Sequence, residues 1–167
     1  MTVAAAVEKM IRFSDGNIHD IEHFMKVWAF AKTIGEQEGL DEHTQFILEL
    51  AAVVHDISCP LCREKYGSTN GKLQEHESPA LIGKFFKDSD LDELDVKRIS
   101  WLAAHHHTYT DVDGIDHRIL LEADFLVNAG EKGSPKSAVR KAREIIFKTQ
   151  SGTRLLNSMF LEACKKV

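Results

Sequence analysis

The sequence predicts an all-α protein, and three observations support that prediction. Apolar residues recur at helical spacing in one segment after another, and no long alternating strand pattern bounded by turns is found. Residues that cap or end helices separate these segments. The chain has 167 residues, 43% hydrophobic and 28% charged, which is typical of one ordinary soluble domain. We therefore expect a single domain, residues 1–167, built as a bundle of about seven to eight helices.

The helices are expected in the following order. The first two lie near residues 3–13 and 18–38, separated by a Ser-Asp-Gly-Asn turn that supplies both a stop and a new N-cap. Asp41 can cap a third helix near 42–56. Asp-rich or Gly-containing breaks separate the later helices, which are expected near residues 74–87, 91–107, 117–130, 135–148 and 151–165.

A long loop is predicted over residues 59–73, which hold a Pro, two Gly, Ser, Thr and Asn. Loops of this length inside compact domains are usually functional or mobile, so this segment is our candidate for closing over a site. Cys59 and Cys62 within it have the CxxC spacing of a redox pair or half of a zinc site. The chain has three cysteines and no second CxxC, so we interpret the spacing as incidental and expect no disulfide framework.

Charge and hydropathy limit the classes of partner that the protein is expected to bind. Twenty-one Lys and Arg against 26 Asp and Glu give a net charge of −5, which opposes binding to long nucleic acids but not to a small phosphorylated molecule. No run approaches the roughly 20 apolar residues of a spanning helix, and the N-terminal stretch lacks the pattern of a signal peptide. We expect no membrane partner and a cytoplasmic location. The residues leave the oligomeric state open, a homodimer included.

Four polar residues fall on, or next to, the apolar faces of predicted helices. His23 and His55 continue the apolar stripes of the second and third helices, and Asp124 lies within the stripe near 117–130. Asp56 follows His55, about 100° further round the helix. A lone inward His is usually satisfied by a hydrogen bond. Buried carboxylates are costly unless paired, however, and one divalent ion would satisfy all four residues at once.

The ligand types indicate which metals are expected and where more ligands lie. Imidazole with carboxylate suits Mn, Fe, Zn, Co or Ni, and one or two ions are compatible with the sequence. His76 opens the helix after the predicted loop, and His105 and His106 lie one turn beyond an apolar stripe. These three histidines could bind a second metal or a phosphate, whereas spacing favours a solvated position for His107.

This pattern resembles the HD-domain metal-dependent phosphohydrolase superfamily, whose signature is a His, an adjacent His-Asp and a distant Asp on different helices. The matching residues are His23, the pair His55-Asp56 after Ala-Ala-Val-Val, and Asp124 in Leu-Leu-Glu-Ala-Asp-Phe-Leu. The resemblance covers roughly residues 18–130 and implies an HD-type helical bundle. Superfamily members with two or three metals add histidines at places where this chain has His76 and the pair His105-His106.

The resemblance implies hydrolysis of a phosphoester or phosphoanhydride on a small molecule, a nucleotide foremost, by attack of a metal-bound water. Asp56, beside that water, could accept its proton, while Lys26, Lys72 or His106 could neutralise phosphate charge. The bond type is left open between monoester, diester and pyrophosphate. The alternatives are a di-iron oxygenase, which the same ligand pattern would serve, and a non-catalytic nucleotide-sensing domain, which would not need four ligands.

Two other motifs fit less well. His-Asp-Ile-Glu-His at 19–23 resembles the HExxH of zinc proteases, but an Asp stands where the catalytic Glu is required. Residues 67–73 resemble a phosphate-binding loop, but the stretch is one residue short, lacks the final Ser or Thr and follows no strand. The protease motif would also leave His55, Asp56 and Asp124 unexplained.

Overall fold

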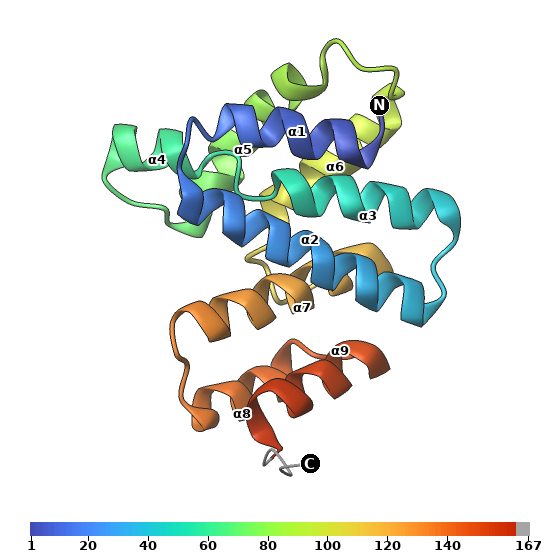
Figure 1. Cartoon of the computed structure of the whole chain (residues 1–167), viewed down its shortest axis with the longest axis vertical. Helices are drawn as coiled ribbons and strands as arrows, with labels where there is room; N and C mark the ends of the chain where they lie inside the picture. Colours follow the sequence, from blue (N-terminus) through green and yellow to red (C-terminus); the bar gives the residue numbers. More distant parts are fainter. Residues whose placement is uncertain (163–167) are drawn as a thin grey trace.

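The computed structural model describes residues 1–162, and these residues form helices with no strand among them (Figure 1). The prediction of an all-α bundle is confirmed. Within the described range the elements are α1 (Val3–Phe13), α2 (Ile18–Glu38), α3 (Glu42–Val54), α4 (Cys59–Tyr66), α5 (Gly71–Phe86), α6 (Glu93–His105), α7 (Gly114–Glu131), α8 (Lys136–Ile145), α9 (Gln150–Leu156) and a π-helical segment, η1 (Asn157–Leu161).

α2 and α3 begin where their predicted N-caps lie. Asn17 accepts a hydrogen bond from the Asp20 amide at the start of α2, and Asp41 accepts from two amides at the start of α3. Gly39 ends α2 with a φ of +74°, a left-handed conformation that favours glycine. Local capping chemistry was therefore enough to place these boundaries.

The predicted loop over residues 59–73 is wrong, because most of it is helical. α4 begins at Cys59 with Pro60 in its first turn, where the missing proline N–H costs no hydrogen bond. It ends at Gly67, whose φ is +63°. Asn70 then caps α5, so that only residues 67–70 connect the two helices. The Pro and Gly that suggested a loop are the start and stop signals of a short helix.

α2 is the central helix of the bundle, packed against α3 on one side and α7 on the other (Figure 1). α6 packs against both α3 and α5, and α1 covers α3. Among the described residues, one stretch is long and apolar enough to cross a membrane, Glu42–Tyr66, but 72% of its most apolar window is buried inside the protein. That burial is typical of the core helix of a soluble protein, and α3 occupies that place here.

The C-terminal part of the chain packs at one end of the bundle, where α9 contacts α2 and α7 (Figure 1). The Thr149 side chain caps α9, and buried Glu122 of α7 accepts hydrogen bonds from the Thr149 hydroxyl and amide. The predicted last helix, 151–165, is divided into α9 and η1. Its residues 163–165 lie outside the described residues.

Candidate metal centre

Four predicted ligands converge from three helices in the interior of the bundle. α2 supplies His23, the residues directly after α3 are His55 and Asp56, and α7 supplies Asp124. The Nε2 atoms of His23 and His55 lie 3.3 Å apart. Asp124 Oδ1 is 3.3 Å from His23 Nε2 and 3.7 Å from His55 Nε2. Asp56 Oδ2 is 3.5 and 3.7 Å from the same two nitrogens, so the four side chains form one cluster.

His106, at the C-terminal end of α6, extends this cluster. Its Nε2 is 3.3 Å from Asp56 Oδ1, and its ring lies edge-on to His55 at 5.0 Å between centroids. Asp56 Oδ1 and His106 Nε2 are both buried, and neither has a hydrogen-bond partner among the described residues. Buried polar atoms are normally paired, because leaving one unpaired costs free energy. The pair therefore indicates a place suited to a cation.

Hydrogen bonds on the far side of each ring fix which nitrogen faces inward. Nδ1 of His23 lies 2.9 Å from Glu131 Oε2, and Nδ1 of His55 and of His106 lie 2.8 and 2.6 Å from backbone carbonyls in the preceding turn. These oxygens accept hydrogen bonds, so Nδ1 carries the proton and Nε2 of each neutral ring has the lone pair. Two such lone pairs facing each other across 3.3 Å would repel, so this position favours a positive charge, either a proton on His23 or a metal ion.

The charges of the cluster show the same need for a cation. Burial opposes protonation of His23, but its hydrogen bond to Asp124 and the charge of Asp56 prevail and raise its pKa to about 9. Burial would raise the pKa of Asp56, but His55 and His106 hold it well below its ordinary value. Burial would likewise raise the pKa of Asp124, but hydrogen bonds with His23 and His55 lower it. Both carboxylates are therefore ionised at neutral pH.

The donor set fits a divalent transition metal. Such an ion, bonded to His nitrogen and carboxylate oxygen at about 2.0–2.2 Å in tetrahedral geometry, separates neighbouring donor atoms by roughly 3.3–3.6 Å. The nitrogen–nitrogen and nitrogen–oxygen distances of 3.3–3.7 Å lie close to that range. Two overlapping groups among the described residues have metal-binding geometry: His23, His55 and Asp56, and Asp56, His106 and His107.

A family model described as HD domain matches residues 20–146, more than half of the chain. The chain belongs to the HD domain family. The match includes all four predicted ligands and extends from α2 to the end of α8. No curated protein and no solved structure matches the chain.

His23, His55, Asp56 and Asp124 are called the HD cluster below. Two residues that hydrogen-bond this cluster were not predicted. Glu131, at the end of α7, holds the His23 ring and is itself 3.3 Å from Lys26 Nζ. Asn128 donates from Nδ2 to Asp124 Oδ1 at 2.7 Å. Asn128 and Glu131 follow Asp124 by four and seven residues, so all three share one face of α7. That spacing is the signal that could have identified them.

The structure does not bring His76 and His105 to the cluster. The His76 side chain is 78% exposed and lies beside Glu77. The His105 ring stacks on Trp101 at 4.3 Å, and its Nδ1 lies 2.8 Å from the Trp101 carbonyl. Adjacent helical residues point about 100° apart, so only His106 of the predicted pair faces inward. The metal-binding role of these histidines stays a prediction.

α5 presents Gln74 to the site rather than His76. Gln74 is buried, and its Nε2 lies 3.1 Å from the Thr69 carbonyl and 3.2 Å from His107 Nε2. His107 packs so closely on Gly71 that a Cβ there would lie 2.9 Å from its ring. Burial of the ring, together with the charge of His106, lowers the pKa of His107 to about 4, so it is neutral at pH 7. Although part of His107 is exposed to solvent, its ring packs on Gly71 and lines the cleft.

The cluster opens into a cleft of about 290 Å³ that carries two cations. Arg63 of α4 and Lys132 at the end of α7 line it, with Gln74, Asn128 and other polar residues. Arg63 forms an ion pair with Asp20, whereas Lys132 has no carboxylate within 4 Å among residues 1–162. The phosphate-binding residues predicted from sequence, Lys26 and Lys72, are not among the residues that line this cleft.

Cys59 and Cys62 are free thiols, both buried in the first turn of α4. Cys59 lines the cleft beside the HD cluster. Burial and the neighbouring Asp56 raise the pKa of Cys59, so its thiol is protonated and a poor nucleophile. This environment does not favour redox chemistry.

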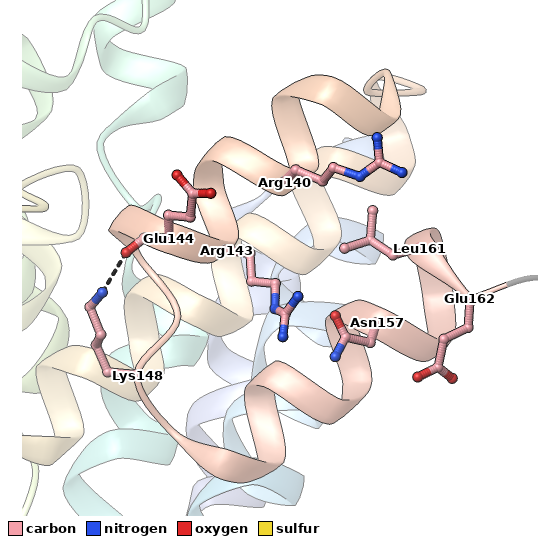
Figure 2. Close-up of a pocket in the computed structure, with 7 residues that line it drawn as sticks. All are labelled: Arg140, Arg143, Glu144, Lys148, Asn157, Leu161 and Glu162. Carbon is pink, nitrogen blue, oxygen red and sulfur yellow. Dashed lines mark hydrogen bonds between the residues drawn. The ribbon is translucent and has the colours of Figure 1, made fainter.

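Two further hollows contrast with this cleft. A compartment of about 210 Å³ shares His107, Asn128 and Lys132 with it and is also lined by Asp124. A larger cavity of about 570 Å³ lies between α8 and η1, lined by Arg140, Arg143, Glu144, Lys148, Asn157, Leu161 and Glu162 (Figure 2). This cavity contains no residue of the HD cluster.

Proposed function

We propose that this HD domain is a metal-dependent phosphohydrolase that acts on a small phosphorylated molecule, a nucleotide above others. The observation that supports the proposal most is the HD cluster itself, with two inward-facing ring nitrogens 3.3 Å apart beside two ionised carboxylates. A divalent ion bound there supplies an acidified water molecule and polarises a phosphate oxygen. Hydrolysis of a phosphate ester or anhydride requires both the nucleophile and the polarised phosphate.

Asp56 is the residue best placed to orient the attacking water. Its Oδ2 faces the two histidines, while its Oδ1 is buried without a hydrogen-bond partner among the described residues. An ionised carboxylate oxygen in that position can accept a hydrogen bond and then a proton from water. We therefore propose Asp56 as the catalytic residue that the chain itself contributes.

Arg63 and Lys132 are suited to bind the substrate phosphate. They line the same cleft from two different elements, and Arg63 is oriented by its ion pair with Asp20. A guanidinium and an ammonium in one cleft neutralise phosphate charge and position the ester. Lys26 is instead paired with Glu131 at 3.3 Å, so we propose a supporting role for it through His23.

The size of the cleft and the charge of the chain support a small-molecule partner. A cleft of about 290 Å³ is at the lower end of ligand pockets, which commonly measure about 300–1,000 Å³. The net charge of −5 does not favour long nucleic acids. We propose a cytoplasmic enzyme, and size-exclusion chromatography with light scattering will establish whether it forms a homodimer.

A second candidate is a di-iron oxygenase, because the structure has a second group of donors. Asp56, His106 and His107 have metal-binding geometry and share Asp56 with the first group. A two-ion centre would serve phosphate hydrolysis as well as iron-oxygen chemistry. Oxygen consumption by the iron-loaded protein would favour the oxygenase, and phosphate release under Mn, Mg or Co would favour the hydrolase.

The test combines metal analysis of the purified protein with a phosphatase screen across nucleotides under Mn, Mg, Co and Fe. We expect a bound transition metal and phosphate release from at least one nucleotide. Asp56→Ala should lose both, while Asp88→Ala, an exposed Asp between α5 and α6, should keep both. A wild type without metal, or an Asp56→Ala variant that keeps metal and activity, would contradict the proposal.

A further inference from the structure

The 210 Å³ compartment beside Asp124 has two aromatic walls that the proposed hydrolysis does not use. Tyr109, Phe125 and Ala129 line it together with polar residues, some of them shared with the cleft beside the HD cluster. The Phe125 ring is held edge-on by Phe147, with centroids 5.7 Å apart and an angle of 82° between the planes. This wall is therefore fixed by packing.

Tyr109 supplies the other aromatic wall from the connection between α6 and α7. Its side chain is 38% exposed although it lines a hollow next to a buried carboxylate. The connection begins with a tight turn, in which the Thr108 amide donates to the His105 carbonyl at 2.8 Å. An accessible aromatic face held in this way is suited to stack on a flat ring.

We propose that this compartment is a subsite for a flat aromatic ring carried by a phosphate ester. Lys132 lines both the compartment and the cleft beside the HD cluster, so one ligand can place its phosphate beside the HD cluster and its ring against Tyr109 and Phe125. The volume equals that of roughly seven water molecules, room for one ring system and not for a macromolecule. The phosphate end of this ligand rests on the proposed function.

A nucleobase and a simple aryl group share this chemistry, and phosphonates that resist hydrolysis distinguish them. Methylphosphonate carries no ring, benzylphosphonate carries an aryl ring, and the phosphonate analogue of adenosine 5′-monophosphate carries a nucleobase. In calorimetric titrations of the manganese-loaded chain, we expect a ring to strengthen binding at least about tenfold over methylphosphonate. A gain for the adenosine analogue alone identifies a nucleobase subsite, and a gain for both identifies a subsite for any aryl ring.

Three variants distinguish the loss of the aromatic wall from a loss of the fold. Tyr109→Ala should remove the advantage of the ring and leave the affinity for methylphosphonate unchanged, and Tyr109→Phe should keep the advantage. The matched control is Tyr66→Ala, because Tyr66 is 40% exposed and bonds Glu77 away from the compartment. Thermal unfolding of each variant establishes that it is folded.

Three results would overturn the subsite: equal affinity of all three probes for the wild type, no detectable binding of any probe, or equal losses in Tyr109→Ala and Tyr66→Ala. Phosphate release by the manganese-loaded chain tests the proposed function separately. If the ring preference is found but the manganese-loaded chain cleaves no phosphate ester, the hydrolase proposal is wrong and the subsite stands.

Discussion

The cleft beside the HD cluster and the cavity between α8 and η1 differ in how their polar groups are held. Around the HD cluster, His23, His55 and Asp124 are almost completely buried, and partners on the far side of each ring fix the histidines. In the cavity of Figure 2, the charged side chains are exposed, and the Lys148 ammonium donates to the backbone carbonyl of Glu144. The polar side chains of the larger cavity are therefore held less firmly than those of the HD cluster.

This difference indicates that the burial and orientation of polar side chains identify a functional site better than the volume of a cavity does. Exposed cations are solvated and can rearrange, so they cost the fold little. Ionised carboxylates and unpaired ring nitrogens in the interior cost free energy and are retained where a cation compensates them. The predictions below test this contrast between the two hollows.

The largest effect is expected when one residue of each hollow is removed. His55→Ala should lose the bound metal and lower activity more than about 100-fold, because even outer partners of a metal site contribute about 10–100-fold. Arg143→Ala should keep metal and activity and change stability by less than about 0.5 kcal/mol. Metal content, turnover and thermal unfolding measure these effects. Equal losses in the two variants would contradict the contrast.

Glu131→Gln tests the orientation of His23 rather than its presence. The neutral amide can still accept from Nδ1, but it is a weaker partner and does not raise the basicity of the ring. We expect metal affinity to fall about 10-fold, and up to about 100-fold for Glu131→Ala, measured by competition with a chelator. Glu162→Gln, in the other cavity, is the matched control and should leave metal affinity unchanged.

The pH dependence of metal binding follows from the pKa of His23, which is about 9 in the metal-free protein. A protonated His23 cannot offer Nε2 to a metal, so apparent affinity should rise with pH between about 6 and 8, by up to about tenfold per unit. Stability of the metal-free protein has the opposite sign: the contribution of His23 is complete below its ordinary pKa of 6.5 and is lost as pH rises through about 9. A metal affinity that does not change between pH 6 and 8 would contradict competition between the metal and a proton on His23.

The smallest effect concerns the wall of the cleft at α5. Gly71→Ala would place a Cβ 2.9 Å from the His107 ring, and we expect a destabilisation of about 1 kcal/mol from overpacking. Gly83→Ala, in the same helix, meets nothing within 4 Å and should stabilise by roughly 0.5–1 kcal/mol through helix propensity. Denaturant unfolding measures both, and opposite signs are the expected outcome.

Much of this arrangement could be predicted from the sequence because apolar periodicity reports which residues face inward. The stripes of α2, α3 and α7 placed His23, His55 and Asp124 correctly in the interior, and family membership followed from their order along the chain. Asp56 is one position off the stripe of α3, and its place in the cluster depends on the residues directly after the helix ends.

The rest of the site could not be predicted, for two physical reasons. Pro60 and Gly67, which lie at the two ends of α4, are also residue types common in loops. The helix that carries Arg63 was therefore not predicted. α5 begins at Gly71, and its register then turns Gln74 rather than His76 towards the cleft. Periodicity within one helix does not report how two helices approach each other.

The most direct test of the central claim is a crystal of the manganese-loaded protein measured for anomalous scattering. We expect a strong anomalous peak at metal-bonding distance from Nε2 of His23 and of His55 and from carboxylate oxygens of Asp56 and Asp124. A second, weaker peak beside His106 and Asp56 would add a two-ion centre. No peak between the two Nε2 atoms, or the only strong peak beside His76 or His105, would contradict the account.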